Sequence, residues 1–242
     1  MKLDDVKKLQ QKKYRNQFGY YLVEGEHLIL ELEKAANHNP QLKKNVRVYV
    51  TEEQQDFATG FDKTVISKKN MAQISDTKSP QGIIASVPLP QLAHAENGSP
   101  HKFIYLHEVQ DPGNLGTILR TLAWFGGFTL LLSPNSVDPF NPKVVRSSMG
   151  AIFHVPMELD VELSELQNRF DRFAYLDMQG TKVSDKTFTD YPCYLFGNEA
   201  RGVPREALDS FNAKAFTIPG SGTIESLNLA MAVSMSVYQL AV

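Results

Sequence analysis

Residues 103–127 of this 242-residue chain read FIYLHEVQDPGNLGTILRTLAWFGG. The apolar start predicts a strand, Pro112 and Gly113 predict a tight loop, and the apolar spacing that follows predicts a helix. The loop presents Asn114, and Arg120 follows on the first turns of the helix. An amide and a guanidinium near the carboxyl end of a strand suit recognition of a sugar hydroxyl and a phosphate. Taken alone, however, the run is more typical of a strand, a turn and a helix with a surface arginine.

Two later runs carry similar chemistry. Residues 195–206, LFGNEARGVPRE, place Glu199 between two glycines, which permit sharp turns and close backbone approach. Residues 217–240, TIPGSGTIESLNLAMAVSMSVYQL, end a strand at proline and glycine and then open a helix with Ser226 and Asn228. Ser226 alone is typical of a helix N-cap. Because ligands of open parallel sheets bind beyond the carboxyl ends of the strands, we expect the three loops to form one site.

Several common sites are excluded by spacing. Gly220 and Gly222 are followed by Glu225 where the dinucleotide fingerprint requires a third glycine, and no phosphate-loop sequence occurs. No histidine or carboxylate spacing typical of a metal site is present, so we expect no metal. The single cysteine, Cys193, excludes an internal disulfide and is typical of a buried small apolar residue.

The composition is typical of a soluble globular protein, with 42% hydrophobic and 21% charged residues. The first ten residues, MKLDDVKKLQ, contain no apolar signal region, and no run approaches the roughly 20 apolar residues that span a bilayer. We therefore expect a cytoplasmic protein without a membrane partner. The net charge of -2 hides an asymmetry, because residues 1–93 carry 14 basic and 11 acidic side chains and the remainder carries 11 and 16.

The chain divides at a proline-rich and polar stretch, VPLPQLAHAENGSPHK. We predict an N-terminal domain over 1–90, a linker over 91–101 and a C-terminal domain over 102–242. In the first domain we expect helices over 23–36 and 68–75 and strands over 46–50, 64–67 and 82–87. In the second we expect strands over 102–109, 128–132, 174–178, 194–196 and 215–218, and helices over 115–125, 142–150, 163–170, 204–209 and 227–240. This alternation predicts an α/β fold with a parallel sheet covered by helices on both faces.

Together, and in this order, the three runs resemble the motifs of the SpoU/TrmH family of RNA ribose 2'-O-methyltransferases, within the SPOUT superfamily. The segment NPKVVRSSMGAIFHVP resembles the stretch that this family carries between its first and second motifs. YRNQFGYYLVEGEHLILELEKA and SPQGIIASV are similar to a small ribosomal-protein-like domain that binds RNA in many members. Asn198 and Gly220 depart from the residues that are common at their positions in the family, and Gly220 could loosen the donor pocket.

The resemblance implies a deep trefoil knot in the C-terminal domain, S-adenosylmethionine (AdoMet) as methyl donor, no metal, and an obligate homodimer. By motif match, the donor is expected against the backbone of Gly197, Ile218 and Leu227. The matched polar residues, expected to be catalytic, are Asn114, Arg120, Glu199, Ser226 and Asn228.

The implied reaction is 2'-O-methylation of a ribose in RNA. Arginine stays protonated, so we expect Arg120 to hold the adjacent phosphate and to stabilise negative charge on the 2'-oxygen, while the phosphate or a water takes the proton. Ribosomal RNA is the expected substrate because of the dedicated N-terminal domain. Transfer RNA is the alternative within the enzyme class, and a non-catalytic RNA-binding or ribosome assembly factor is the alternative outside it.

Basic residues near the N-terminus predict phosphate contacts, because the first twenty residues carry six basic and two acidic side chains. Tyr14, Phe18 and Tyr20 could add base stacking. A solvated lysine-rich helix with core aromatic residues explains the pattern about as well. The predicted RNA-binding residues are Lys7, Lys8, Lys12, Lys13 and Arg15.

Overall fold

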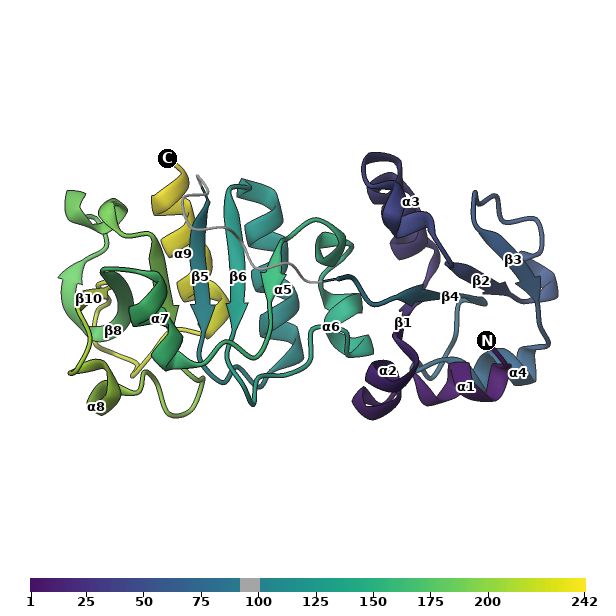
Figure 1. Cartoon of the computed structure of the whole chain (residues 1–242), viewed down its shortest axis with the longest axis horizontal. Helices are drawn as coiled ribbons and strands as arrows, with labels where there is room; N and C mark the ends of the chain where they lie inside the picture. The colour runs from purple at the N-terminus through teal and green to yellow at the C-terminus, as the bar shows by residue number, and fades with distance from the viewer. Residues whose placement is uncertain (92–100) are drawn as a thin grey trace. The chain divides into compact units, whose positions relative to one another are not determined.

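The computed structural model describes residues 1–91 and 101–242, which fold into two compact units (Figure 1). The first unit combines Met1–Gln91 with Asp138–His154, and the second contains the described residues of 92–137 together with Val155–Val242. The segment 138–154 therefore belongs to the first unit, although it lies within the range predicted for the C-terminal domain. Most of the expected linker falls outside the described residues, and the division into 1–90, 91–101 and 102–242 stays a prediction.

The first unit is built on a four-stranded sheet in the order β1-β4-β2-β3. Its strands are β1 (Tyr20–Glu24), β2 (Arg47–Val50), β3 (Asp62–Val65) and β4 (Ile83–Pro88). β4 is antiparallel to β1 and β2, whereas β2 and β3 are parallel. Its helices are α1 (Leu3–Lys8), α2 (Lys12–Phe18), α3 (Glu26–His38), α4 (Lys68–Ile74) and α6 (Pro142–Ser147), with 3-10 turns η1 (Pro40–Lys43), η2 (Glu52–Gln54) and η3 (Ala151–Phe153). Figure 1 shows α3 on one side of the sheet and α1, α2 and α4 on the other.

The helix predicted over 23–36 is wrong at its start. Val23 and Glu24 belong to β1, and the chain turns at Gly25, whose φ is 104°. Only then does α3 begin, at Glu26. A short buried strand followed directly by an amphipathic helix presents one continuous apolar pattern, so spacing alone could not find the break.

A buried ion pair joins the segment 138–154 to the rest of the first unit. The guanidinium of Arg15, whose side chain is 2% exposed, donates to Asp138 Oδ2 from Nε at 3.0 Å and from Nη2 at 2.5 Å. Nη1 donates to the carbonyl oxygens of Leu9 and Gln10 at 2.9 Å. Tyr21 and Phe140 add a ring contact with centroids 4.9 Å apart. This ring contact and the two hydrogen bonds from Arg15 to Asp138 tie the segment to the unit.

The second unit is built on a six-stranded sheet, β10-β8-β9-β5-β6-β7, in which all neighbouring strands are parallel. The α/β class and the parallel sheet predicted from the sequence are confirmed. The strands are β5 (Lys102–Leu106), β6 (Phe128–Leu132), β7 (Met157–Glu158), β8 (Phe173–Lys182), β9 (Cys193–Phe196) and β10 (Ala213–Thr217). The helices are α5 (Pro112–Phe125), α7 (Leu163–Arg169), α8 (Arg205–Leu208) and α9 (Leu229–Ala241), with the 3-10 turn η4 (Lys186–Asp190).

Helices α5 and α9 pack against each other. The hydroxyl oxygens of Thr121 on α5 and Ser234 on α9 are hydrogen-bonded at 2.8 Å. The ring centroids of Phe125 and Tyr238 lie 6.1 Å apart. A separate apolar cluster includes Leu166 of α7 and Tyr105, Phe173 and Leu195 of the strands. The trefoil knot stays a prediction, with which this strand order and the packing of α9 on α5 are compatible.

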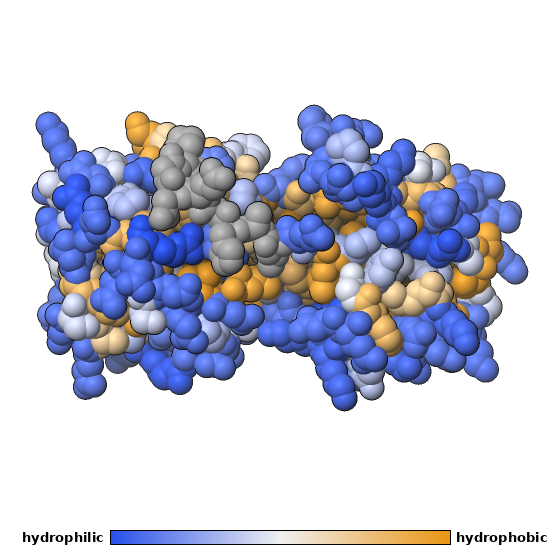
Figure 2. Space-filling view, viewed as in Figure 1, coloured by the Kyte–Doolittle hydropathy of each residue, from blue (hydrophilic) through white to orange (hydrophobic). Residues whose placement is uncertain are grey.

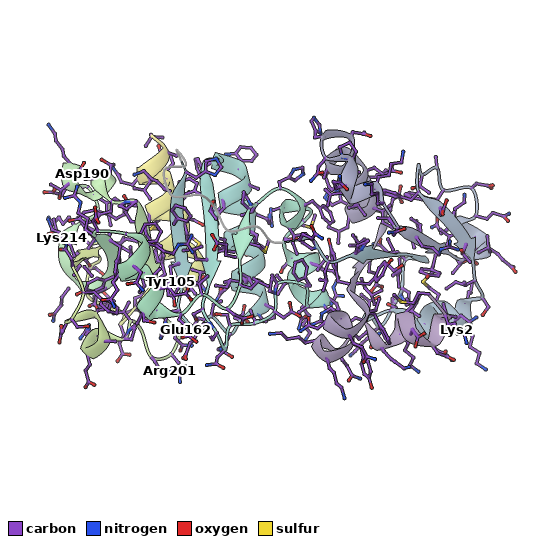
Figure 3. The ribbon with its side chains drawn as sticks, viewed as in Figure 1. Lys2, Tyr105, Glu162, Asp190, Arg201 and Lys214 are labelled. Atoms are coloured by element: carbon purple, nitrogen blue, oxygen red, sulfur yellow. The ribbon has the colours of Figure 1, made fainter. Side chains whose placement is uncertain are left out.

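The strands of this sheet direct three loops to one end. Figure 3 shows Arg201 at the end toward which the arrows of β5 and β6 point in Figure 1, whereas Asp190 and Lys214 lie toward the opposite end. β8 and β9 pair at two positions, Ala174 with Tyr194 and Tyr175 with Leu195, and then separate. The separation opens the sheet at its carboxyl edge, where parallel sheets bind their ligands.

Hydrophilic side chains cover much of the visible surface of each unit (Figure 2). Within residues 1–91 and 101–242, no helix has the length and apolar character needed to cross a membrane.

We predict that Arg15→Ala lowers the free energy of unfolding by about 3 kcal/mol, because it leaves the Asp138 carboxylate buried without its partner. Urea unfolding followed by circular dichroism at 222 nm measures the change. Lys12→Ala, at an exposed position of the same helix, should change it by less than about 0.5 kcal/mol. Equal midpoints for the two variants would contradict a structural role for the ion pair.

Candidate functional site at the carboxyl edge of the parallel sheet

Glu199 joins the loop after β9 to the loop after β5. Its carboxylate accepts a hydrogen bond from the backbone N–H of Gln110 at 3.1 Å and from that of Asp111 at 3.1 Å. It also accepts a hydrogen bond from Asn114 Nδ2 at 3.1 Å. A carboxylate only accepts hydrogen bonds, so two backbone donors of the loop and one side-chain donor from the first turn of α5 converge on a suitable acceptor.

Asn114 extends this contact to the third loop. Its Oδ1 accepts a hydrogen bond from Asn228 Nδ2 at 2.9 Å. Asn228 is the N-cap of α9, and its Oδ1 accepts hydrogen bonds from the backbone N–H groups of Ala230 and Met231. The sequence suggested Ser226 as the cap, but the helix begins two residues later than that. One chain of side-chain hydrogen bonds, from Glu199 through Asn114 to Asn228, therefore links all three loops.

The loop after β9 is tightly closed. Asn198 and Gly202 exchange two backbone hydrogen bonds of 2.9 Å, and Asn198 Oδ1 accepts from the backbone N–H groups of Ala200 and Arg201. A Cβ on Gly197 would lie 2.2 Å from the backbone carbon of Gly202, so no larger residue fits there. Asn198 thus satisfies the turn with its own side chain.

An open cleft of about 1920 Å³ lies between these loops. The three residues expected to hold the donor, Gly197, Ile218 and Leu227, all line it. Four of the five predicted catalytic residues, Asn114, Glu199, Ser226 and Asn228, line it as well. The structure therefore brings seven of these eight residues to one cleft, as a common site requires.

Arg120 is the exception. It does not line the cleft, and it lies on the exposed side of α5 with Thr117 and Trp124. Trp124 is 84% exposed. Within the described residues, Arg120 has no hydrogen bond or ion pair, so its guanidinium is available to a ligand.

The predicted RNA-binding residues divide into two groups. Lys7, Lys12 and Lys13 are exposed, and Lys8 is half-buried beside Asp5, the ring of Tyr14 and the ring of Phe18. Arg15 is a correction, because the structure buries its guanidinium against Asp138, where it cannot meet a phosphate. A basic residue in a lysine-rich stretch gives no sequence signal of a carboxylate 123 positions away.

Sequence reasoning missed an ion pair on the cleft wall. Arg205 donates from Nε to Asp177 Oδ2 at 2.8 Å and from Nη2 to Oδ1 at 2.6 Å, and both residues line the cleft. Burial acts to raise the pKa of Asp177, but the hydrogen bonds from Arg205 and from backbone N–H groups outweigh it and lower the pKa below its ordinary value. Asp177 is therefore ionised at neutral pH. Asp177 lies on β8 and Arg205 on α8, and no sequence pattern indicates that two charged residues 28 positions apart are paired.

Two other expectations can be placed. Cys193 is fully buried, and burial raises the pKa of its thiol, which fits a structural residue and not a nucleophile. Gly220 is exposed, and a Cβ there would contact nothing, so a side chain at that position would meet no obstacle. Within the described part of the chain, no group of three histidine, cysteine or acidic residues is placed to hold a metal ion.

Two family models match the chain. The SpoU rRNA Methylase family matches residues 101–238, and the MRM3-like substrate binding domain matches residues 2–85. A Bacillus subtilis protein described as 23S rRNA (guanosine(2553)-2'-O)-methyltransferase RlmP is 32% identical over 99% of this chain and 95% of its own length. The mouse protein described as rRNA methyltransferase 3, mitochondrial, is 28% identical over 93% of this chain and 68% of its own length.

Solved structures give the same picture. A Porphyromonas gingivalis structure, assigned to the TrmH family of RNA methyltransferases, matches with a TM-score of 0.79 and 28% identity over 98% of this chain and 96% of that one. An AdoMet-bound rRNA methyltransferase from Sinorhizobium meliloti shares the fold, with a TM-score of 0.79 at 24% identity over 98% of this chain and 93% of that one. A structure described by 2-OH methylation of C/U34 on tRNA matches 95% of its own length but only 58% of this chain, with a TM-score of 0.52 and 28% identity.

We predict that Glu199→Gln speeds amide hydrogen exchange at Gln110 and Asp111 by about tenfold or more, because hydrogen bonds to a charged acceptor contribute about 1.5–3 kcal/mol. Exchange followed by NMR at single residues measures this. Glu206→Gln, on the same cleft but without a contact to that loop in the described structure, is the matched control. Unchanged exchange in the Glu199 variant would show that its carboxylate does not hold the loop.

Proposed function

We propose a function from one established premise: this chain belongs to the SpoU rRNA methylase family. The protein transfers the methyl group of AdoMet to a ribose 2'-oxygen of RNA, and its substrate is ribosomal RNA. The observation that carries the proposal is the hydrogen-bonded chain from Glu199 through Asn114 to Asn228, which gathers the three matched loops around one cleft.

The cleft is large enough for the donor, and its lining suits the donor's chemistry. Gly197 supplies backbone groups to the cleft lining, and Ile218 and Leu227 supply apolar surface. These three residues would hold the donor. When bound, AdoMet supplies a methyl carbon attached to a sulfonium, which a nucleophilic oxygen can attack.

Asn114, Glu199 and Asn228 act as positioning residues in this proposal. Both carboxylate oxygens of Glu199 accept hydrogen bonds from the loop after β5 and the start of α5, and in the described residues no hydrogen bond or ion pair joins Glu199 to Arg120. We therefore assign Glu199 to holding this loop in place. Asn114 spends one N–H and one oxygen lone pair on its two partners, which leaves one N–H and one lone pair for a ribose. Ser226 lines the cleft and does not cap α9, and we propose that its hydroxyl orients the ribose.

Arg120 carries the charge chemistry. Its guanidinium holds the phosphate next to the reacting ribose and stabilises negative charge that develops on the 2'-oxygen. It does not accept the proton, since arginine stays protonated in proteins. That proton passes to the phosphate or to water.

The N-terminal unit favours ribosomal RNA over transfer RNA. The tRNA-related structure matches over nearly its whole length and yet covers only 58% of this chain, so it has no counterpart to most of the remainder. Residues 2–85 match a substrate-binding domain model instead. Transfer RNA stays the alternative substrate, and a non-catalytic RNA-binding factor is disfavoured by the presence of all five matched polar residues. The cytoplasm stays the predicted compartment.

We propose that the protein works as a homodimer formed through α5 and α9. Met231, Met235 and Tyr238 form an apolar stripe along α9, and Leu227 lies just before the helix. The four side chains are 42–56% exposed. Trp124 extends the apolar surface onto α5, one residue before Phe125, which contacts Tyr238. We propose that a second copy of the chain covers this apolar face. Arg120 lies one helical turn before Trp124 on α5, so the dimer would bring its guanidinium to the interface.

The decisive test is methylation of RNA isolated from cells that lack the protein. We predict one new 2'-O-methyl site in ribosomal RNA, mapped by resistance to alkaline cleavage, and Arg120→Ala should reduce turnover about 100-fold or more. AdoMet affinity, measured by calorimetry, should change less than threefold in that variant, as roughly expected for a residue outside the donor cleft. A new site in transfer RNA would favour the alternative, and no methylation of either RNA would reject the proposal.

RNA binding should depend on the lysines of α1 and α2. Lys12→Ala with Lys13→Ala should weaken RNA binding and reduce the slope of log affinity against log salt by roughly 0.7–0.9 for each phosphate that the variant no longer neutralises. Lys43→Ala with Lys44→Ala is the matched control, because these two lysines are also exposed and adjacent in the chain. Filter binding over a salt series measures both, and identical slopes for the two double variants would place RNA elsewhere.

The dimer is tested by light scattering after gel filtration. Met231→Lys should convert a species of twice the chain mass into one of 27.1 kDa, since it places a charge in the apolar face. Met178→Lys changes an exposed methionine of β8 outside this face and should leave the dimer intact. A wild-type protein that is monomeric at micromolar concentration would remove the dimer from the proposal.

A further inference from the structure

The cleft has an excess of negative charge. Five carboxylates line it against two guanidiniums, so its formal charge is -3. The acidic residues are Asp111, Asp177, Glu199, Glu206 and Glu225, and the basic residues are Arg201 and Arg205. RNA-binding surfaces carry the opposite sign, because phosphates must be neutralised. The charge of this cleft therefore points to a cationic ligand.

Nearby ion pairs and helix ends do not reverse that sign. Arg205 is neutralised by Asp177, and Arg201 is paired with Glu108, which is not part of the lining. Helices α5 and α9 begin at the cleft, and each N-terminus contributes about half a positive charge. Two such ends leave an excess of about two negative charges.

Glu206 and Glu225 are the carboxylates whose charge is least compensated. Both are exposed, and neither has a hydrogen bond or ion pair within the described residues. The other three carboxylates have partners within the protein. Asp111 caps α5, Asp177 pairs with Arg205, and Glu199 accepts hydrogen bonds from the loop after β5. A cleft with an excess of one sign of charge attracts a ligand of the opposite sign.

We propose that this charge makes the cleft discriminate between donor and product, so that AdoMet binds more tightly than S-adenosylhomocysteine. This inference rests on the proposed function. The donor is a monocation at neutral pH, with a sulfonium, an ammonium and a carboxylate. When the C–S bond breaks, its electron pair stays on sulfur, the methyl carbon bonds to the ribose oxygen, and the 2'-hydroxyl proton leaves. The product is a thioether whose ammonium and carboxylate cancel, so its net charge is zero. Methyl transfer therefore removes the positive charge that the cleft attracts, which favours product release.

Isothermal calorimetry on the full chain tests this without any measurement of activity. The probes are AdoMet, S-adenosylhomocysteine and sinefungin, in which a carbon bearing an ammonium replaces the sulfonium. At 50 mM salt we expect both cationic probes to bind roughly fivefold to tenfold more tightly than the neutral product. At 300 mM salt the difference should shrink, because added ions screen exposed charges.

Charge-neutral variants locate the source of the effect. Glu206→Gln combined with Glu225→Gln should reduce the preference for the cationic probes to about twofold or less, with near-normal affinity for the product. Glu52→Gln, at an exposed position of the first unit, alters the net charge of the protein but not that of the cleft and is the control. Thermal unfolding checks that each variant is folded.

The outcomes separate the two proposals. If all three probes bind with equal affinity and equal salt dependence, the charge discrimination is wrong while the donor site stands. The charge discrimination is also wrong if the double variant keeps the full preference. If the folded protein binds none of the probes, the proposed function fails and this inference fails with it.

Discussion

The candidate site depends on the hydrogen bonds that the carboxylate of Glu199 accepts. Because this carboxylate can only accept hydrogen bonds, the amide of Asn114 must turn its Nδ2 toward Glu199. Its Oδ1 is then free to accept a hydrogen bond from Asn228. Asn228 must then donate with Nδ2, which leaves its own Oδ1 to cap α9. A single ionised group thus sets the orientation of two amides and joins three loops that lie far apart in the chain.

The parallel sheet makes this interaction possible. β5 and β9 are hydrogen-bonded neighbours, so the loops that follow them emerge side by side. β8 separates from β9 after Tyr175, and the gap becomes the cleft. In the loop after β9, the backbone of Gly202 passes so close to Gly197 that any Cβ on Gly197 would clash with it. The glycine therefore allows this loop to fold back on itself. Sheet order and one close backbone approach, and not side-chain identity alone, create the candidate site.

Charge is divided between the two units according to the proposed ligands. Exposed lysines gather on α1 and α2 of the first unit, whereas the cleft of the second is acidic. The only predicted site cation of the second unit, Arg120, lies outside that cleft. Phosphates would meet the lysines and Arg120, and the monocationic donor would meet the carboxylates. The net charge of -2 conceals this separation.

The sequence by itself determined the alternation of strands and helices, the parallel sheet and three loops with the right polar residues, because these follow from local periodicity and turn chemistry. Only the tertiary structure decided that Arg15 is a buried partner of Asp138, that β1 precedes α3, that Asn228 caps α9, and that Asp177 pairs with Arg205. Each of these depends on which distant groups meet or on where a regular element is interrupted. A one-dimensional pattern records residue type and spacing, but burial and pairing of charges arise only when remote segments share the same space.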